Sequence, residues 1–248
     1  MALQEELENQ GNWLFRYRGT LPLIILLLGY ILFTRTRLYP ETSFLGESNE
    51  IYFGTFCLLV SLFGLAIRVY TVGHTPKNTS GRNISQLADL VNTTGSYSVV
   101  RHPLYLGNFF MWAGPALLTG HFWFFIAFCL FFWLYYERIM FAEEQFLRKK
   151  FGSAYSGWAQ RTPAFIPNFK LYMRPHYSFS WKKVLKKEKN GLAAVFLIFF
   201  IFDVTRQIIE TDTYHNYGTA ILCVLTGILY LVLKYIKKKT RLLDEDDR

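Results

Sequence analysis

Apolar residues in this chain form long unbroken runs and do not alternate with polar residues at helical or strand spacing. Runs of about 20 apolar residues match the hydrocarbon core of a membrane. The stretch from Pro103 to Tyr136 contains no charged residue. As one helix it would be roughly 50 Å long, far more than a core of about 30 Å requires. It is therefore predicted to turn back at Thr119-Gly120-His121 as a tight helical hairpin.

The other runs predict an all-α, polytopic integral membrane protein with about six transmembrane helices. Only 18% of the residues are charged, whereas an average soluble domain has roughly 25%. The composition therefore favours a single membrane domain over residues 1–248. The predicted spans lie at about residues 20–33, 51–72, 103–118, 122–136, 191–204 and 217–236.

The charges of the connecting segments predict the orientation. Residues 74–103, residues 137–190 and the tail after Tyr235 are basic, whereas residues 119–121 and 209–216 contain no Lys or Arg. Basic segments are retained in the cytoplasm, so both termini are expected on the cytoplasmic side. This orientation places Arg35 and Arg37 in the first external loop, which is contrary to the cytoplasmic retention of basic segments. Beyond Glu137 we expect a helix that continues out of the fourth span through Tyr155 and Trp158, followed by an extended, proline-rich path.

The net charge of +9 does not predict a nucleic-acid partner, because the lysines cluster beside apolar runs, where they can attract lipid headgroups. The partners expected are the bilayer and a lipid or lipidated substrate. No metal site is predicted, since no CxxC pair or Cys/His cluster occurs. No GxG and no GK[ST] occurs either, which argues against a dinucleotide fingerprint and a phosphate loop. The oligomeric state stays open.

The predicted hairpin brings ionisable residues about forty positions apart to one membrane boundary. Ionisable groups at such a boundary often belong to a functional site. Plain anchoring of the helix ends by charged residues is an equal alternative on physical grounds. The residues concerned are Arg101, His102, Glu137, Arg138, Glu143 and Glu144.

Two sequence blocks in this region resemble a known signature. The first reads Gly95-Ser-Tyr97-Ser-Val-Val-Arg101-His102-Pro103-Leu-Tyr105-Leu-Gly107, and the second is Glu143-Glu144-x-x-Leu147-x-x-x-Phe151-Gly152-x-x-Tyr155-x-x-Trp158, then Arg161-Thr-Pro163. With Gly64-x-x-x-Arg68 before them, they resemble the isoprenylcysteine carboxyl methyltransferase family, whose superfamily includes phospholipid methyltransferases. The resemblance covers about residues 60–168. It implies a methyltransferase core at about 51–170, followed by a two-span extension at about 189–248.

The resemblance also implies a cytosolic pocket for S-adenosylmethionine. The chemistry of the residues agrees, since a carboxylate such as Glu144 can accept hydrogen bonds from ribose hydroxyls or an amino group. His102 stands at a helix N-terminus, where an anionic group is favoured, and tyrosine rings can contact a sulfonium cation. The residues carried over to the cofactor pocket are Tyr97, His102, Pro103, Tyr105, Leu106, Glu143 and Glu144.

The acceptor is predicted to be a lipid-like or prenylated anion. Arg68 and Arg138 are the candidates for holding it in line with the methyl group, because an arginine at the end of an apolar span is costly unless it is paired. Lys77 and Arg82 flank Gly81 in a polar segment that could form an anion site for the acceptor. An ordinary polar turn is the alternative for that segment.

Several functions remain open beside isoprenylcysteine-type O-methylation. A phospholipid or lipid-phosphate methyltransferase would use the same cofactor, and sterol reductases of related architecture would use NADPH instead. A non-enzymatic carrier or scaffold is the third alternative. The spans argue against a carrier, since apart from Asp203 they lack the paired broken helices or mid-membrane charges that mark a transport path.

Overall fold

A computed structural model describes residues 2–39, 50–77, 86 and 88–245 of the chain. This part of the chain is helical and contains no strand, with one isolated bridge between Gly95 and Met173. The predicted all-α class is therefore confirmed for the residues described. The helices are α1 (Leu3–Arg16), α2 (Leu21–Leu38), α3 (Glu50–Gly73), α4 (Ser96–Val99), α5 (Pro103–Leu118), α6 (Phe122–Phe151), α7 (Ser153–Ala159), the 3₁₀ helix η3 (Phe169–Leu171), α8 (Trp181–Thr211) and α9 (Tyr217–Lys239).

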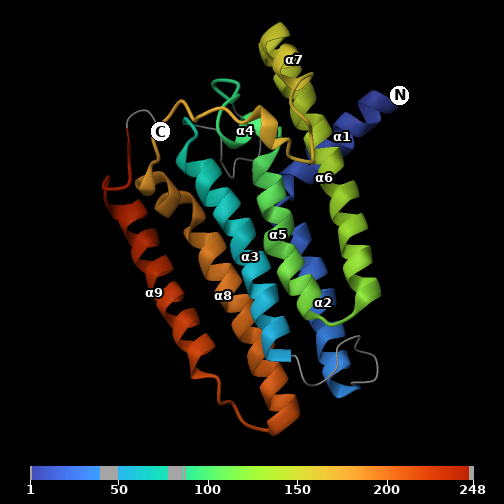
Figure 1. Cartoon of the computed structure of the whole chain (residues 1–248), viewed down its shortest axis with the longest axis vertical. Coiled ribbons are helices and arrows are strands. Elements are labelled where there is room, and N and C mark those ends of the chain that lie inside the picture. The colour runs from blue at the N-terminus through green and yellow to red at the C-terminus, as the bar shows by residue number, and fades with distance from the viewer. Residues whose placement is uncertain (1, 40–49, 78–85, 87, 246–248) are drawn as a thin grey trace.

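Four helices of the described chain, α3, α6, α8 and α9, are long and apolar enough to cross a membrane. The other two predicted spans form α2 and α5, which lie beside them in Figure 1 but are not among these four. The count of six spans is thus not established. The prediction placed Arg35 and Arg37 in a loop, whereas both lie in the last turn of α2, where Arg37 pairs with Glu210 on α8 at 3.1 Å.

The hairpin predicted within residues 103–136 is present as α5 and α6. Gly120 occupies the turn with φ +65°, a conformation that residues with a Cβ rarely adopt. The Nδ1 atom of His121 accepts a hydrogen bond from the backbone N–H of Phe124 at 3.2 Å, which caps α6. As expected, α6 continues beyond the apolar run, but it ends at Phe151: Gly152, with φ +55°, interrupts the predicted helix, and Tyr155 and Trp158 lie in the separate helix α7.

Helices α3 and α5 cross at backbone contact. A Cβ built on Gly64 would lie 2.5 Å from the carbonyl oxygen of Gly107, and one built on Gly107 would lie 2.6 Å from Cγ of Arg68. Farther along the same interface, a Cβ on Gly114 would lie 2.1 Å from Oγ of Ser61. Small residues let two membrane helices approach closely, and here they leave room for the stem of Arg68 to pass α5.

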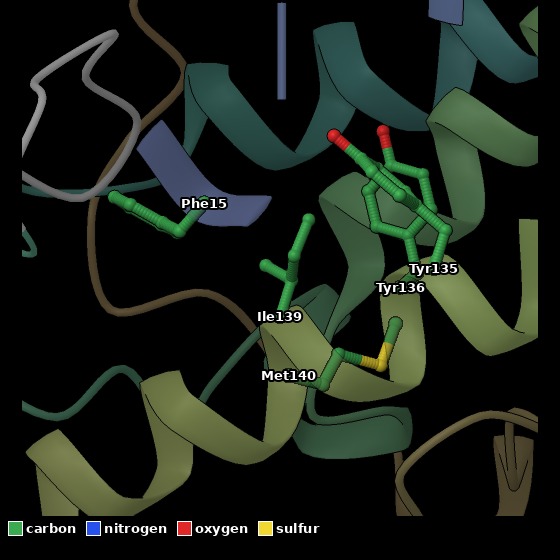
Figure 2. Close-up of a cluster of buried hydrophobic side chains, with 5 residues drawn as sticks. All are labelled: Phe15, Tyr135, Tyr136, Ile139 and Met140. Carbon is green, nitrogen blue, oxygen red and sulfur yellow. The ribbon is translucent and has the colours of Figure 1, made fainter. Parts of the chain in front are cut away.

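An N-terminal helix that the hydrophobic runs do not predict, α1, packs against α6. A Cβ on Gly11 would lie 2.1 Å from the carbonyl oxygen of Arg138, so this crossing also requires glycine. Figure 2 shows the buried cluster at the junction, in which Phe15 of α1 joins Tyr135, Tyr136, Ile139 and Met140 of α6.

The two described ends of the chain lie at the same end of the bundle as α4 and α7 (Figure 1). The α5–α6 turn and the α8–α9 connection lie toward the other end. After α7 the proline-rich segment runs without long helices and binds the start of α5 through the 2.9 Å hydrogen bond from Arg101 N to Pro163 O. The residues with the motif blocks are thus gathered at one end of the bundle.

Candidate functional site

The Arg-His-Pro block lies in the short connection between α4 and α5. Gly95, directly before α4, has φ +62°, which strongly favours glycine, and donates its N–H to the carbonyl of Met173 at 3.0 Å. Pro103 is the first residue of α5, a position where its missing N–H costs nothing. The side chains of Arg101 and His102 are therefore presented at the beginning of α5 by a backbone held from both sides.

Glu144 of α6 binds both of these side chains. Its Oε2 accepts a hydrogen bond from Nη1 of Arg101 at 2.8 Å, and its Oε1 lies 3.0 Å from Nε2 of His102. Glu143 adds a longer contact, with Oε2 at 3.7 Å from Nδ1 of His102. The hairpin thus joins groups 42 and 43 positions apart in sequence. The imidazole side chain is only 6% exposed, so its orientation is set by these carboxylates.

Aromatic rings extend this group of charged residues. The ring of Tyr105 stacks on His102 with centroids 5.7 Å apart and contacts Tyr136 at 4.9 Å. Burial and the neighbouring carboxylate of Glu143 raise the pKa of Tyr97 above its ordinary value, so its phenol is neutral at physiological pH. These rings offer neutral aromatic surface beside a carboxylate, which suits a cationic ligand with a planar group.

A second charged group surrounds Arg68 on α3. Its Nε and Nη2 atoms donate to the two carboxylate oxygens of Glu188 on α8, at 2.8 and 2.7 Å. Its Nη1 donates to Oδ1 of Asn108 at 2.7 Å, and Asn108 in turn donates to the hydroxyl of Tyr136 at 3.2 Å. The carboxylate of Glu188 is 5% exposed, and such a buried group requires a partner of this kind.

One cavity of about 770 Å³ borders both charged groups. This size is within the range of roughly 300–1,000 Å³ typical of small-molecule sites. Five of the residues expected in the site line it, namely Arg68, Tyr97, His102, Tyr105 and Glu143. Met111 and Trp112 of α5 and Ala194 and Ile198 of α8 extend the lining with apolar side chains.

The other expected residues lie elsewhere. Pro103 and Leu106 are on α5 without being part of the cavity lining, and Glu144 contributes through Arg101 and His102, which do line it. Arg138 contacts Glu137 at 3.6 Å, at the α1–α6 crossing. Lys77 follows the end of α3 and is not in the lining, and Arg82 lies outside the described residues.

Glu188 and Asn108, which form hydrogen bonds with Arg68, were not predicted from the sequence. The basic side chains that α8 and α9 bring to the cavity, among them Lys187, Lys189 and Lys237, were not predicted either. The available signal for Glu188 was one acidic residue among lysines, directly before an apolar run. Its partner 120 positions earlier was not apparent from any local pattern.

The composition of the cavity fits S-adenosylmethionine, which carries a sulfonium, an amino-acid group, a ribose diol and adenine. Glu143 offers acceptor oxygens, His102 offers a ring nitrogen, and Tyr97 and Tyr105 offer ring faces. The described residues include no group of three His, Cys, Asp or Glu side chains that could hold a metal ion. The arrangement therefore suits an organic cofactor.

Comparison with known proteins agrees with this chemistry. A family model described as phospholipid methyltransferase matches residues 50–154. A protein-S-isoprenylcysteine O-methyltransferase of Schizosaccharomyces pombe is 38% identical over 32% of this chain and 33% of its own length. Protein-S-isoprenylcysteine O-methyltransferase B of Arabidopsis thaliana is 32% identical over 44% of this chain and 59% of its own. The cobalt-zinc-cadmium resistance protein CzcN of Cupriavidus metallidurans is 34% identical over 46% and 52%.

These matches are partial, and the chain spans between 33% and 59% of the length of these relatives. No solved structure matches the chain significantly. The family match begins with α3 and ends within α7, so it includes Arg68, the Arg-His-Pro block and the Glu143-Glu144 pair while leaving out α8 and α9. Residues 50–154 are thus similar to phospholipid methyltransferases, and stretches of the chain are similar to two isoprenylcysteine O-methyltransferases.

Proposed function

We propose that this chain transfers a methyl group from S-adenosylmethionine to an anionic lipid-like or prenylated acceptor at the cytoplasmic face of a membrane. One observation carries the proposal: a single cavity borders both the His102–Glu143 group and the Arg68 group. The first group suits the cofactor and the second suits an anion. The match of residues 50–154 to the phospholipid methyltransferase model and the similarity to isoprenylcysteine O-methyltransferases support the same reaction class.

In this proposal the carboxylates of Glu143 and Glu144 offset positive charge, while Glu144 keeps Arg101 and His102 in place. Tyr97 and Tyr105 line the cofactor side with rings. When bound, the cofactor supplies an electrophilic methyl carbon: a bond from the acceptor oxygen to carbon forms as the carbon–sulfur bond breaks, and the sulfonium becomes a neutral thioether.

Arg68 then holds the acceptor oxygen in line with that carbon. An acceptor that is already an anion needs no general base, so alignment and exclusion of water contribute most of the acceleration. The apolar lining of α5 and α8 excludes water and contacts the lipid part of the acceptor. Lys77 and Arg82 are retained as predicted acceptor contacts at the membrane surface.

The first test is thermal stabilisation of the purified full-length protein in detergent. S-Adenosylmethionine and S-adenosylhomocysteine are expected to raise the Tm, and His102→Ala and Glu144→Gln are expected to abolish the shift. NADPH is tested in parallel. A Tm shift with NADPH alone would contradict the proposal and favour a sterol-reductase-like activity.

A second measurement follows transfer of a labelled methyl group into membrane lipids and farnesylated cysteine. Label in either acceptor is expected, and the identity of the labelled product distinguishes carboxyl O-methylation from phospholipid or lipid-phosphate methylation. Cofactor binding that persists in Glu144→Gln, without transfer to any acceptor, would instead favour a non-enzymatic scaffold.

A further inference from the structure

Helix α8 contributes a residue to the cavity from outside the segment that matches the family model. Glu188 lies 34 positions beyond the end of that segment, since the match ends at residue 154. Its carboxylate lines the same cavity as Tyr97 and His102, and it is 5% exposed. Glu188 is therefore part of the cavity and not a surface charge.

The position of Glu188 is set by contacts that do not involve its own charge. At the start of α8, Ser180 donates its N–H to the carbonyl of Gly73 at 2.9 Å, and Lys183 donates to the carbonyls of Thr75 and Pro76 at 2.6 and 2.7 Å. These bonds join the first turn of α8 to the end of α3. The axial position of α8 relative to Arg68 is thus set about one and a half to two turns before Glu188.

One turn later, Gly191 fixes the distance between α8 and its neighbours. A Cβ built there would lie 3.2 Å from Cε of Met111 on α5 and 3.5 Å from Cδ1 of Leu65 on α3. The distance to Met111 is shorter than most Cβ contacts by a few tenths of an ångström, whereas the distance to Leu65 is ordinary van der Waals contact. This packing lets the short carboxylate side chain of Glu188 reach the guanidinium of Arg68 at two points.

The hydrogen bonds of Arg68 to Glu188 and Asn108 use three of the N–H donors of its guanidinium. A guanidinium has five N–H donors. Glu188 takes one on Nε and one on Nη2, and Asn108 takes one on Nη1. The second N–H groups of Nη1 and Nη2 remain, and no further hydrogen bond within the described chain uses them. N–H groups of a guanidinium suit a carboxylate or phosphate oxygen.

We infer that Glu188 is a positioning residue that holds Arg68 so that the remaining N–H groups of its guanidinium bind the negatively charged oxygen of the lipid acceptor. This inference rests on the proposed methyl transfer and names the contact that would select the acceptor. Because Glu188 cancels the charge of Arg68, attraction of the acceptor over longer distances falls to Lys187, Lys189 and Lys237, which line the same cavity. Arg68 then orients the bound acceptor oxygen and adds little net positive charge to the cavity.

The experiment uses the full-length protein in phosphatidylcholine vesicles with labelled S-adenosylmethionine. Two acceptors are supplied separately: S-farnesylcysteine, which carries a carboxylate, and phosphatidic acid, which carries a phosphate. Glu188→Gln is expected to raise the apparent KM of the acceptor by about tenfold or more, since it removes one partner of a buried charge pair. The dissociation constant of S-adenosylmethionine should stay within about twofold of wild type, because Glu188 is assigned to the acceptor and not to the cofactor.

Two variants separate positioning from general stabilisation. Glu188→Asp keeps the charge and should recover part of the lost acceptor affinity. Glu210→Gln is the matched control, because Glu210 also forms an ion pair from α8, with Arg37 at 3.1 Å, but at the other end of the helix and far from the cavity lining. It should leave the KM of the acceptor unchanged.

An unchanged acceptor KM in Glu188→Gln, or an equal rise in Glu210→Gln, would overturn the inference. So would a parallel loss of cofactor affinity in Glu188→Gln, which would indicate a structural role. If the wild type binds S-adenosylmethionine but neither binds nor methylates either acceptor, the assignment of an anionic acceptor fails while the cofactor proposal stands. Absence of cofactor binding by the wild type would instead refute the proposed function itself.

Discussion

The cavity is flanked by two arginine–glutamate pairs that are assembled in different ways. Glu144 receives Arg101 and His102 from the other arm of one hairpin, about forty positions away in sequence. Glu188 receives Arg68 from a helix 120 positions earlier. The first carboxylate is 14% exposed and shared by two partners, whereas the second is 5% exposed and bound by one guanidinium through two parallel bonds.

The difference indicates a division of roles. The Glu144 group lies wholly within the segment that matches the family model, so we assign it to the common cofactor. The Arg68–Glu188 pair joins that segment to a helix beyond it, so we assign it to the acceptor, which can differ among relatives. Four variants would break or sharpen this assignment.

The largest effect is expected from Glu144→Gln. The amide loses the charge that holds Arg101 and His102, and their donors face a weaker acceptor. The affinity for S-adenosylmethionine should fall by about 10- to 100-fold, which is roughly 1.4–2.7 kcal/mol. Titration calorimetry on the detergent-solubilised protein measures this loss. In Glu188→Gln, measured in the same way, the affinity for S-adenosylmethionine should fall by less than about twofold. Equal losses of affinity in the two variants would contradict the division of roles.

Gly107→Ala should act next most strongly, and on the Arg68 side of the cavity. The new methyl group would lie 2.6 Å from Cγ of Arg68 and 2.9 Å from the carbonyl oxygen of Gly64, and one of these contacts is backbone. Such overpacking costs about 1–3 kcal/mol of unfolding free energy and displaces Arg68. A lower Tm with a raised acceptor KM is expected.

Gly157→Ala is the matched control for that substitution. Gly157 lies in the short helix α7, and a Cβ built there meets open space. Alanine favours a helix over glycine by about 1 kcal/mol, so the Tm should stay the same or rise. A fall in Tm as large as that of Gly107→Ala would show that the close α3–α5 crossing is not what limits stability.

Asp203→Ala tests whether α8 matters to the cavity only near Glu188. Asp203 accepts hydrogen bonds from Asn216 at 2.9 Å and from Thr219 at 2.7 Å, and so joins α8 to the start of α9. Loss of these bonds should destabilise the protein by about 1–2 kcal/mol, measured as a lower Tm. Cofactor affinity and acceptor KM should both remain at the wild-type level. A change in either would mean that the far end of α8 also controls the site.

The smallest effect is expected from Tyr97→Phe at alkaline pH. The folded-state pKa of Tyr97 is raised by burial and then by Glu143, with Arg68 opposing them, so this phenol responds to both sides of the cavity. Because the folded-state pKa exceeds the unfolded value near 10, its stabilising contribution is complete below about pH 10 and is lost as pH rises further. Between pH 9 and 11 the Tm of Tyr97→Phe should decline less than that of wild type. The corresponding difference in the free energy of unfolding is about 1 kcal/mol or less. Tyr235→Phe, at an exposed position on α9, should decline as wild type does.

Much of the helical architecture followed from local pattern. The uncharged run of residues 103–136 was too long for one span, and the structure places the turn at the expected Thr119–His121 position. The continuation of α6 and the proline-rich segment after α7 were likewise expected. Helix α1 was missed because its apolar face is narrow and becomes informative only once Gly11 and Phe15 meet α6.

Within the site, too, some contacts followed from local sequence pattern and others did not. The sequence by itself determined the membrane helices, the hairpin and the group around His102 and Glu144, because hydrophobic length and a short turn relate residues about forty positions apart. Only the tertiary structure decided that Glu188 would face Arg68. That contact depends on how closely α8 packs at Gly191 against α3 and α5, and such packing is set by side-chain shapes on three helices together and not by the periodicity of any one.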